Sequence, residues 1–515
     1  MADKLYFSRD AKLYVELTSN AGAFQGLWEV PVLDGFSFSQ TTNQTEIGLN
    51  EMESTAGISR RGRRLFTDSL APAEWSFSTY VRPTLKNTSE HHLVDEVLWA
   101  AMAGADLHAG TGSSENGDFS RNSGDKATVS GTVLDVTGAT LPSGGTGALL
   151  SFGESNRSTL PKLTLYFVFE TDTTNPMVYK LSSAIVNECS IDFDIDGIAT
   201  ANWSGFAKEV EDIQTKGEVI VQSGTTISGA TVGNVYLDSN DDLRLGVATA
   251  ATTLRSAYNT GVTSTSNFIR NRLTQLEVRG QNPDVMEGKR VAISSEDGSG
   301  EFTTSAAHGL SVGDVVRVSG LGGVDAATFN GVNLFVKTVP STTTFTLSAT
   351  AGGSTLSGTV TTSGSPVVDT GIYSFTLTGG NITISNNINY LVPEELGTIN
   401  KPIEGVTGAR AIGGNFTCYL VFDSATGNTG ASADFFSDLV DPNKGLTKVV
   451  NEFDVTFKVG GVVSGQPRIH LNFPKVHIDV PSHNIEDVVA LETNFGAYTN
   501  DFDTVDEFNL EVFGV

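Results

Sequence analysis

A row of carboxylates is the feature of this chain that comes nearest to a reactive site. Between 184 and 196, apolar residues alternate with acidic and hydroxyl residues, which predicts a strand with one apolar and one polar face. The polar positions are Glu188, Ser190, Asp192, Asp194 and Asp196. Paired carboxylates could serve a glycosidase as acid and base, or bind a cation. Side chains in a row along a strand do not converge on one point, so we interpret this face as a solvated, negatively charged wall.

Isolated histidines and two cysteines are the other candidates for chemistry. His91 and His92 lack clustered cysteines or a further histidine one helical turn away, so the pattern does not favour a zinc site. His308 lies in a turn-like segment without a nucleophile motif around it. Cys189 and Cys418 are too few for a disulfide framework and are typical of small buried apolar residues. The sequence predicts no catalytic residue, no metal and no cofactor.

The composition is that of a β-rich globular protein. Its 515 residues include 55 glycines, 39% hydrophobic residues and only 18% charged residues, and this length accommodates two or three domains. Acids outnumber bases 59 to 32, and the formal charge of −27 repels nucleic acid. That charge argues against a protein that grips DNA, although not against one that handles DNA without binding it. The first residues include no signal-peptide core and no stretch is long enough for a membrane span, so we expect synthesis in the cytoplasm and no membrane contact.

Two similar strand pairs, each with a long loop between its members, indicate an internal repeat. Residues 75–80 alternate Trp75 and Phe77 with polar residues and stop before Pro83, the pattern of a half-buried strand. The segment 76–81 is matched by 415–420, which carries Phe416 and Tyr419. Upstream of each long loop, residues 36–41 are matched by 382–387.

The elements after each strand pair follow the same order in both halves. A helix is predicted at 89–103 in the first half and at 433–440 in the second, and closing strands follow each helix. Self-similarity on this scale predicts two copies of one fold. The predicted organisation is a first domain at 1–210 with a loop excursion at 105–160, a linker at 211–266, a second domain at 267–279 and 368–515, and an inserted small β-domain at 280–367.

The loop at 42–72 carries most of the charge in its neighbourhood. Long connections of this kind inside a compact domain are usually functional, and we interpret this one as an assembly arm. Its charged candidates for assembly contacts are Glu46, Glu51, Glu53, Arg60, Arg61, Arg63 and Arg64.

Three segments resemble the major tail tube proteins of long, non-contractile-tailed phages, in particular the subgroup that carries two tube domains in one chain. They read FTDSLAPAEWSFSTY at 66–80, ISNNINYL at 384–391 and NFIRNRLT at 267–274. The resemblance covers nearly everything outside 105–160, 210–265 and 280–367. This chain departs from the subgroup because its extra domain lies inside the second copy, whereas an immunoglobulin-like domain at the C-terminus is commoner there.

The resemblance implies a mainly β fold of two tandem β-sandwich or half-barrel domains, each with a flanking α-helix, plus the inserted β-domain. Three chains would form a ring of pseudo-sixfold symmetry, and rings would stack through the loops at 42–72 and 391–413. The inner sheets would surround an acidic channel through which DNA passes without specific binding. The implied partners are further copies of the chain and the tail tape measure, tail tip and tail terminator proteins. The implied place is the virion, after assembly in the host cytoplasm.

Roles for individual residues follow from that expectation. Candidates for the lumen wall are Asp192, Asp194 and Asp196, and candidates for the inner sheet are Trp75, Phe77, Phe416 and Tyr419. The charged residues of the loop at 42–72 would contact the next ring. The insert would lie outside the tube, because three copies inside would obstruct DNA, and there it could bind host-surface glycans or only decorate the tail.

Two other classes of protein remain open on the sequence. A secreted or cell-surface adhesin built from β-repeats agrees with the Ser, Thr and Gly content, but no signal peptide is present and the repeated helix does not favour it. An enzyme using the acidic row lacks a paired-acid, metal or nucleophile motif. A tube subunit should form rings or filaments in negative-stain microscopy, whereas an adhesin should bind cells and an enzyme should turn over a substrate.

Overall fold

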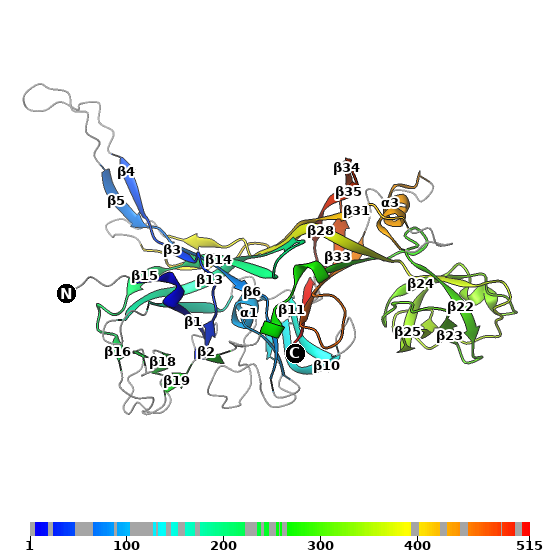
Figure 1. Cartoon of the computed structure of the whole chain (residues 1–515), viewed down its shortest axis with the longest axis horizontal. Coiled ribbons are helices and arrows are strands. Elements are labelled where there is room, and N and C mark those ends of the chain that lie inside the picture. The colour runs from blue at the N-terminus through cyan, green and yellow to red at the C-terminus, as the bar shows by residue number, and fades with distance from the viewer. Residues whose placement is uncertain are drawn as a thin grey trace, which may run out of the picture.

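The chain is elongated and consists mainly of β-strands, which confirms the predicted mainly β class (Figure 1). The computed structural model describes residues 6–18, 24–46, 65–86, 90–103, 127–129, 132–140, 146–152, 160–169, 176–221, 234–237, 242–246, 254–256, 258–259, 265–392, 401–422, 430–442, 452–485, 487–499 and 507–515. Every structural statement below concerns these residues.

The first repeat is a pair of packed sheets that share one long strand. This strand, β13 (Met177–Asp194), pairs through its first half with the outer sheet and through its second half with the inner sheet. The outer sheet runs in the order β2, β1, β12, β13 and β15; the inner sheet runs in the order β3, β6, β14 and β13. Phe38 of the inner sheet packs on Phe167 and Tyr179 of the outer sheet. The bounds are β1 (Ala11–Thr18), β2 (Phe24–Val30), β3 (Ser37–Ser39), β6 (Ala73–Tyr80), β12 (Lys162–Phe169), β14 (Thr200–Ala207) and β15 (Glu209–Asp212).

The second repeat has the same arrangement, again with long shared strands. Its strand β28 (Ile372–Ser385) pairs through its first half with β21 and through its second half with β31. The outer sheet runs in the order β28, β21, β32, β33 and β36. In the inner sheet, β28 pairs with β31 and β31 with β35, and both β33 and β34 pair with β35. The bounds are β21 (Gln275–Gly280), β31 (Ala411–Tyr419), β32 (Phe453–Val459), β33 (Arg468–Ile478), β34 (Ser482–Ile485), β35 (Val489–Ala497) and β36 (Phe508–Phe513).

The strand pairings of the two repeats correspond one to one. Strands β1, β12, β14 and β6 correspond to β21, β32, β35 and β31, while β2 and β3 correspond to the two halves of β28. The long strand β13 corresponds to β33 followed by β34. If Phe77 is aligned with Phe416, the neighbouring strands place Phe38 at the position of Ile382. The sequence match of 36–41 with 382–387 is therefore two residues out of register.

One helix stands beside each inner sheet. The helix predicted at 433–440 is confirmed as α3 (Ser432–Val440), and the helix predicted at 89–103 is shorter, because α1 spans Glu96–Ala103. His91 and His92 lie instead on β8 (Glu90–Leu93), which pairs with β7 (Pro83–Lys86). Every residue of α1 is buried, since the helix lies between the first repeat and the strand β11, so it is not the half-exposed amphipathic helix that we expected.

The excursion at 105–160 contributes strands to the second repeat. Strands β9 (Ala127–Val129), β10 (Thr132–Thr140) and β11 (Thr146–Phe152) form a sheet in that order. Strand β11 pairs with β36 along Ala148–Phe152, which extends the outer sheet of the second repeat. The two repeats consequently share one continuous hydrophobic core, in which Phe152 packs on Phe508 and Trp99 on Trp203.

The segment predicted as a linker contains a small sheet. It runs β16 (Val219–Val221), β17 (Val235–Leu237), β18 (Leu243–Gly246) and β19 (Leu254–Ser256), and β20 (Tyr258–Asn259) pairs with β2. Its apolar side chains, such as Val235 and Leu243, pack on Tyr14 and Tyr166 of the outer sheet. It therefore covers the outer face of the first repeat. Short 3-10 helices occur at Ser8–Asp10, Thr265–Asn267 and Asn271–Leu273.

The inserted segment is a closed barrel at one end of the molecule (Figure 1). It enters after β21 and returns into β28, so it lies at a hairpin tip, where whole-domain insertion is tolerated. Its core is separate from that of the repeats and includes Phe302, Phe329 and Phe345. The barrel order is β22 (Arg290–Glu296), β23 (Glu301–Thr304), β26 (Thr344–Ser348), β25 (Asn333–Ser341), β24 (Val315–Ser319) and β27 (Val367–Asp369), with the short helix α2 (Ala326–Phe329).

Candidate assembly interface

The two repeats of the chain are joined edge to edge by β13 and β28. The second halves of these strands pair antiparallel from Glu188 opposite Ser385 to Asp194 opposite Gly379. Asp192 lies opposite Asn381 and accepts a hydrogen bond from its side-chain amide. We call this junction the internal seam. It makes one inner sheet of the strands β3, β6, β14, β13, β28, β31, β35 and β34, in that order.

One face of this continuous sheet is apolar and buried, and the other is polar. On β6, burial alternates strictly, with Trp75 and Phe77 buried and the serines between them half-buried. Phe416 on β31 is buried likewise, whereas Tyr419 is 45% exposed and points to the opposite face. The four inner-sheet candidates thus lie on β6 and β31, but three belong to the core and Tyr419 belongs to the polar face.

The polar face carries carboxylates, and the eight strands of the continuous sheet contribute no Lys or Arg to it, although Lys475 lies near the end of β33 that also pairs with β35. The strands β3, β6, β14, β31, β34 and β35 and the second halves of β13 and β28 contain no Lys or Arg. Their acids are Glu74, Glu188, Asp192, Asp194 and Glu492. A surface of this composition attracts no phosphate, because it offers neither cations nor a helix terminus to bind one.

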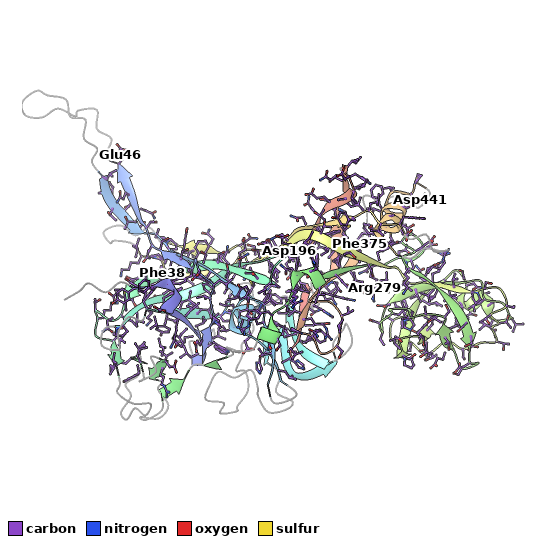
Figure 2. All side chains as sticks on the ribbon, viewed as in Figure 1. Phe38, Glu46, Asp196, Arg279, Phe375 and Asp441 are labelled. Atoms are coloured by element: carbon purple, nitrogen blue, oxygen red, sulfur yellow. The ribbon has the colours of Figure 1, made fainter. Side chains whose placement is uncertain are left out.

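The three aspartates predicted for one wall do not have the same surroundings. Asp192 and Asp194 are exposed on the polar face of β13, and Asp192 also accepts a hydrogen bond of 3.0 Å from Asn202. Asp196 lies beyond the end of the strand in a bend and forms an exposed ion pair of 3.3 Å with Arg272 (Figure 2). The alternation of the sequence could not show that the strand stops at Asp194.

The two outer edges of the continuous sheet are β3 and β34. Each has one strand neighbour among the described residues, β6 for β3 and β35 for β34. Strand β34 corresponds to the part of β13 that forms the internal seam, and all four of its residues are exposed. Strand β3 corresponds to the part of β28 on the other side of that seam. The alternation of the sequence predicts a strand at 475–480 and not β34, because Pro481 interrupts the apparent strand.

The long loop at 42–72 is described only at its base. Strands β4 (Thr42–Glu46) and β5 (Leu65–Leu70) form a hairpin stem that extends away from the sheets, with Glu46 at its far end (Figures 1 and 2). Both strands are largely exposed. The other charged candidates, Glu51, Glu53, Arg60, Arg61, Arg63 and Arg64, lie outside the described residues.

The equivalent stem in the second repeat has different surroundings. It consists of β29 (Asn389–Leu391) and β30 (Glu404–Val406), and it packs against the first repeat of its own chain. Ile388 and Tyr390 form an apolar cluster with Leu160 and Ile185. The stem therefore lies across the internal seam.

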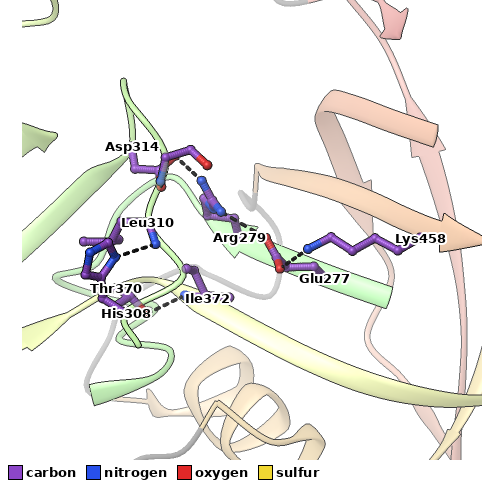
Figure 3. A network of polar contacts seen from close by, with 9 residues as sticks. Glu277, Arg279, His308, Leu310, Asp314, Thr370, Ile372 and Lys458 are labelled. Carbon is purple, nitrogen blue, oxygen red and sulfur yellow. Dashed lines mark hydrogen bonds and ion pairs between the residues drawn. The ribbon is translucent and has the colours of Figure 1, made fainter. Parts of the chain in front are cut away.

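A network of charged groups fixes the insert to the second repeat (Figure 3). Arg279 on β21 pairs with Asp314 of the barrel and, at 2.9 Å, with Glu277, which in turn pairs with Lys458 at 2.6 Å. Burial opposes ionisation of Glu277, but Arg279 and Lys458 outweigh it and lower the pKa of that carboxyl. These residues line a small cavity that Asp454 also lines, and burial raises the pKa of the Asp454 carboxyl to about 6.

His308 has a structural role beside this network. Its Nδ1 accepts a hydrogen bond of 2.9 Å from the backbone amide of Leu310, and burial lowers the pKa of the imidazole (Figure 3). This agrees with its interpretation as a turn residue. Within the described part of the chain, no cluster of His, Cys, Asp or Glu has the arrangement of a metal site.

None of the described helices is long and apolar enough to cross a membrane.

One relative matches almost the whole chain. The tail tube protein pb6 of Escherichia phage T5 is 23% identical over 508 residues, which are 98% of this chain and 75% of that protein. An alignment that runs through both repeats and the insert agrees with the three segments that first indicated a tail tube protein. The chain is therefore similar to a phage tail tube protein along almost its whole length.

Comparison with family profiles and with solved structures adds nothing to this finding. No family profile matches the chain. A crystal structure of a Pseudomonas aeruginosa FadL homologue aligns over 98% of this chain and 87% of its own, but at 8% sequence identity and a TM-score of 0.07. That score carries no information about the fold.

Proposed function

We propose that the chain is a structural subunit of a phage tail tube, in which copies join through the outer edges of the continuous sheet. The internal seam carries this proposal, because it is a complete example, within one chain, of the contact that neighbouring chains would make. The inner sheets of two repeats meet there through β13 and β28, and the counterparts of those edges, β34 and β3, are open on opposite sides of the same chain. Joined to another copy, both edges gain the ladder hydrogen bonds that they lack.

The seam also gives the register of the proposed contact. Opposite Ser190, Ile191, Asp192 and Phe193 at the seam lie Thr383, Ile382, Asn381 and Gly380. Transferred through the strand equivalences, this pairing sets Ser482 opposite Ser39, His483 opposite Phe38, Asn484 opposite Ser37 and Ile485 opposite Phe36. The contact is head-to-tail, so it makes a closed ring if the rotation between copies closes and a filament if it does not.

We infer a ring of three chains, since the resemblance is to tail tube proteins with two tube domains per chain. Six inner sheets would then form one barrel, with its polar face toward the channel. A trimer carries three times −27, or −81 formal charges, and an acidic lumen keeps phosphates from binding while DNA passes. Rings would stack through the loops at 42–72 and 391–413 into a tube in the virion, assembled in the host cytoplasm.

The remaining partners follow from a place in the tail. The tail tape measure would occupy the lumen before DNA does, and tail tip and tail terminator proteins would contact the two ends of the tube. The insert would lie on the outside, available to host-surface glycans. No enzymatic step is part of this role.

A disulfide across the proposed junction tests the ring. Ser37→Cys and Asn484→Cys together should crosslink chains under mild oxidation, and the gel ladder should end at three chains because a ring closes. The pair Asp192→Cys with Asn381→Cys is the matched control, since it should link within one chain. The native Cys189 and Cys418 are buried, and burial raises the pKa of both thiols, so they should stay inert. Absence of intermolecular links while the control pair forms, or a ladder that continues past three chains, would contradict the three-chain ring.

A further inference from the structure

The two hairpin stems are equivalent in sequence position but differ in what they touch. The second stem, β29 with β30, is held on the first repeat by a hydrogen bond of 3.1 Å from the Tyr390 hydroxyl to the Ser183 carbonyl. Exposed ion pairs lie beside it, Lys401 with Glu209 at 3.1 Å and Lys162 with Glu404 at 2.5 Å. Such exposed pairs contribute little energy, but they fix the orientation of the stem.

The first stem, β4 with β5, exposes apolar side chains. Leu65 and Phe66 are 50% and 48% exposed on a stem that is otherwise polar. The first stem lies next to the edge strand β3, beyond which no further repeat follows in the same chain. The surface that would cover it, equivalent to the one under the second stem, would belong to a repeat on the other side of that edge. In a single chain that repeat does not exist.

The equivalent surface can be located on the second repeat. Ile185 pairs with Phe206 in the first repeat as His477 pairs with Gly496 in the second. Two residues further along β14 and β35, the backbone hydrogen bonds also correspond. The amide of Lys208 donates to the carbonyl of Ser182, and the amide of Tyr498 donates to the carbonyl of Lys475. The counterpart of the surface under the second stem is thus the patch at 475–477 and 496–498, in which Tyr498 is 40% exposed.

Side-chain sizes on the two stems and the two surfaces are complementary. Gly405 of the second stem lies so close to the first repeat that an added Cβ would be 2.7 Å from Cδ1 of Ile185. If Phe77 is aligned with Phe416, the position of Gly405 in the first stem is occupied by Phe66. The surface that it would meet has His477 at the position of Ile185 and, paired with it, Gly496 at the position of Phe206. No atom lies within 4 Å of a Cβ built on Gly496.

We infer that the first stem docks sideways on the second repeat of the neighbouring chain in the same ring, with Phe66 over Gly496 between His477 and Tyr498. A small residue on the stem meets a large one on the surface inside the chain, and a large residue on the stem meets a small one between chains. This inference rests on the proposed ring, and it assigns the base of the loop at 42–72 to contacts within a ring. The part of the loop beyond this base would then contact the next ring.

A compensating pair of substitutions tests the docking. Gly496→Phe should fold, because its Cβ has open space, but it should occupy the site of Phe66 and reduce the fraction of assembled rings at least tenfold. Adding Phe66→Gly should restore assembly to within threefold of the natural chain, since the pair then copies Gly405 and Phe206. Val324→Phe, on an 85% exposed position of the insert, is the control for an added aromatic side chain. Unchanged assembly by Gly496→Phe, or a double variant no better than the single one, would overturn the inference.

A second measurement separates this inference from the ring itself. Phe66→Cys with Gly496→Cys should crosslink neighbouring chains in a ladder that ends at three, in parallel with the edge pair Ser37→Cys and Asn484→Cys. If the edge pair links and the stem pair does not, the docking is wrong and the ring stands. If the stem pair gives a ladder beyond three chains, it links different rings, and the docking within a ring is wrong. If neither pair links, both proposals fail.

Discussion

Asn381 on β28 donates its side-chain amide to Asp192 on β13, although the two residues are 189 positions apart in the sequence. This hydrogen bond lies on the polar face of the sheet, at the seam where the two repeats of one chain meet. It shows how an exposed carboxylate of one repeat is satisfied by the next repeat.

Reversing the charge of the polar face should slow the release of DNA without preventing ring assembly. Asp192→Lys with Asp194→Lys should leave rings intact, because both residues are exposed, but it should place cations where DNA is proposed to pass. Release of DNA from virions carrying this variant should slow several-fold, with the largest effect at low salt. Val324→Lys on the insert is the control. Release at the natural rate would argue that these aspartates do not face the lumen.

The arginines of the long loop should act between rings. Arg63→Glu with Arg64→Glu should stop tube growth and leave the subunit folded, since reversed charges would repel acids on the next ring. Electron microscopy should then show single rings in place of tubes, and circular dichroism should be unchanged. Tubes of normal length would refute this role.

Gly205 should not accept even one methyl group. A Cβ at this position would lie 2.1 Å from the carbonyl oxygen of Ile185 and 2.5 Å from the Trp75 ring. Overpacking of this kind costs about 1–3 kcal/mol or more, so Gly205→Ala should lower the midpoint of thermal unfolding by several degrees. Gly496→Ala, which meets nothing, should leave the midpoint nearly unchanged. Equal midpoints for the two variants would mean that Trp75 moves aside freely.

Asp95 should make stability depend on pH. It is fully buried next to the start of α1 and accepts a hydrogen bond of 2.8 Å from Thr79, but burial dominates and raises its pKa from 3.8 to about 6. The folded state therefore holds a proton that the unfolded state releases, and stability falls as the pH rises from 4 to 6. At pH 7 the cost is on the order of 2–3 kcal/mol.

Asp95→Asn should remove this cost, because asparagine cannot ionise and still accepts from Thr79 and suits a position before a helix. The variant should unfold at a higher temperature than the natural chain at pH 7 and at the same temperature at pH 4. Asp196→Asn, at an exposed position, should show no such difference. A gain that is equal at both pH values would assign the effect to packing rather than to charge.

Arg279 should matter far more than a surface arginine. Its side chain is 15% exposed, and removing it leaves the buried carboxylate of Asp314 without its arginine and leaves Glu277 with Lys458. Loss of one member of a buried ion pair costs about 3–5 kcal/mol, whereas Arg272→Ala should cost under about 1 kcal/mol because its pair with Asp196 is exposed. Arg279→Ala should therefore increase protease cleavage between the insert and the second repeat. Equal cleavage of the two variants would show that the barrel is held mainly by its backbone connections.

Elements with strong local patterns could be predicted closely. The sequence predicts strands at 301–304 and 315–319, which are the bounds of β23 and β24, and α3 begins one residue before the predicted helix at 433–440. Each of these elements depends on period-two or helical alternation between turn residues. The beginning of α1 was wrong, because residues 90–93 pair with β7 and tertiary pairing overrode the helical periodicity. Strand β36 was not predicted, and Glu511 within it is fully buried beside His470.

The sequence by itself determined that the chain is mainly β, that one unit occurs twice and that a further β-unit interrupts the second copy. These properties can be recognised along the chain, because strands show a local alternation of polar and apolar residues and the two copies contain similar segments. The tertiary structure alone decided that β11 extends the sheet of the other repeat, that β13 and β28 meet, and that β3 and β34 stay open. Pairing between distant strands is fixed by backbone hydrogen bonds and by the surface left over after local packing, and neither leaves a periodic trace in the residues.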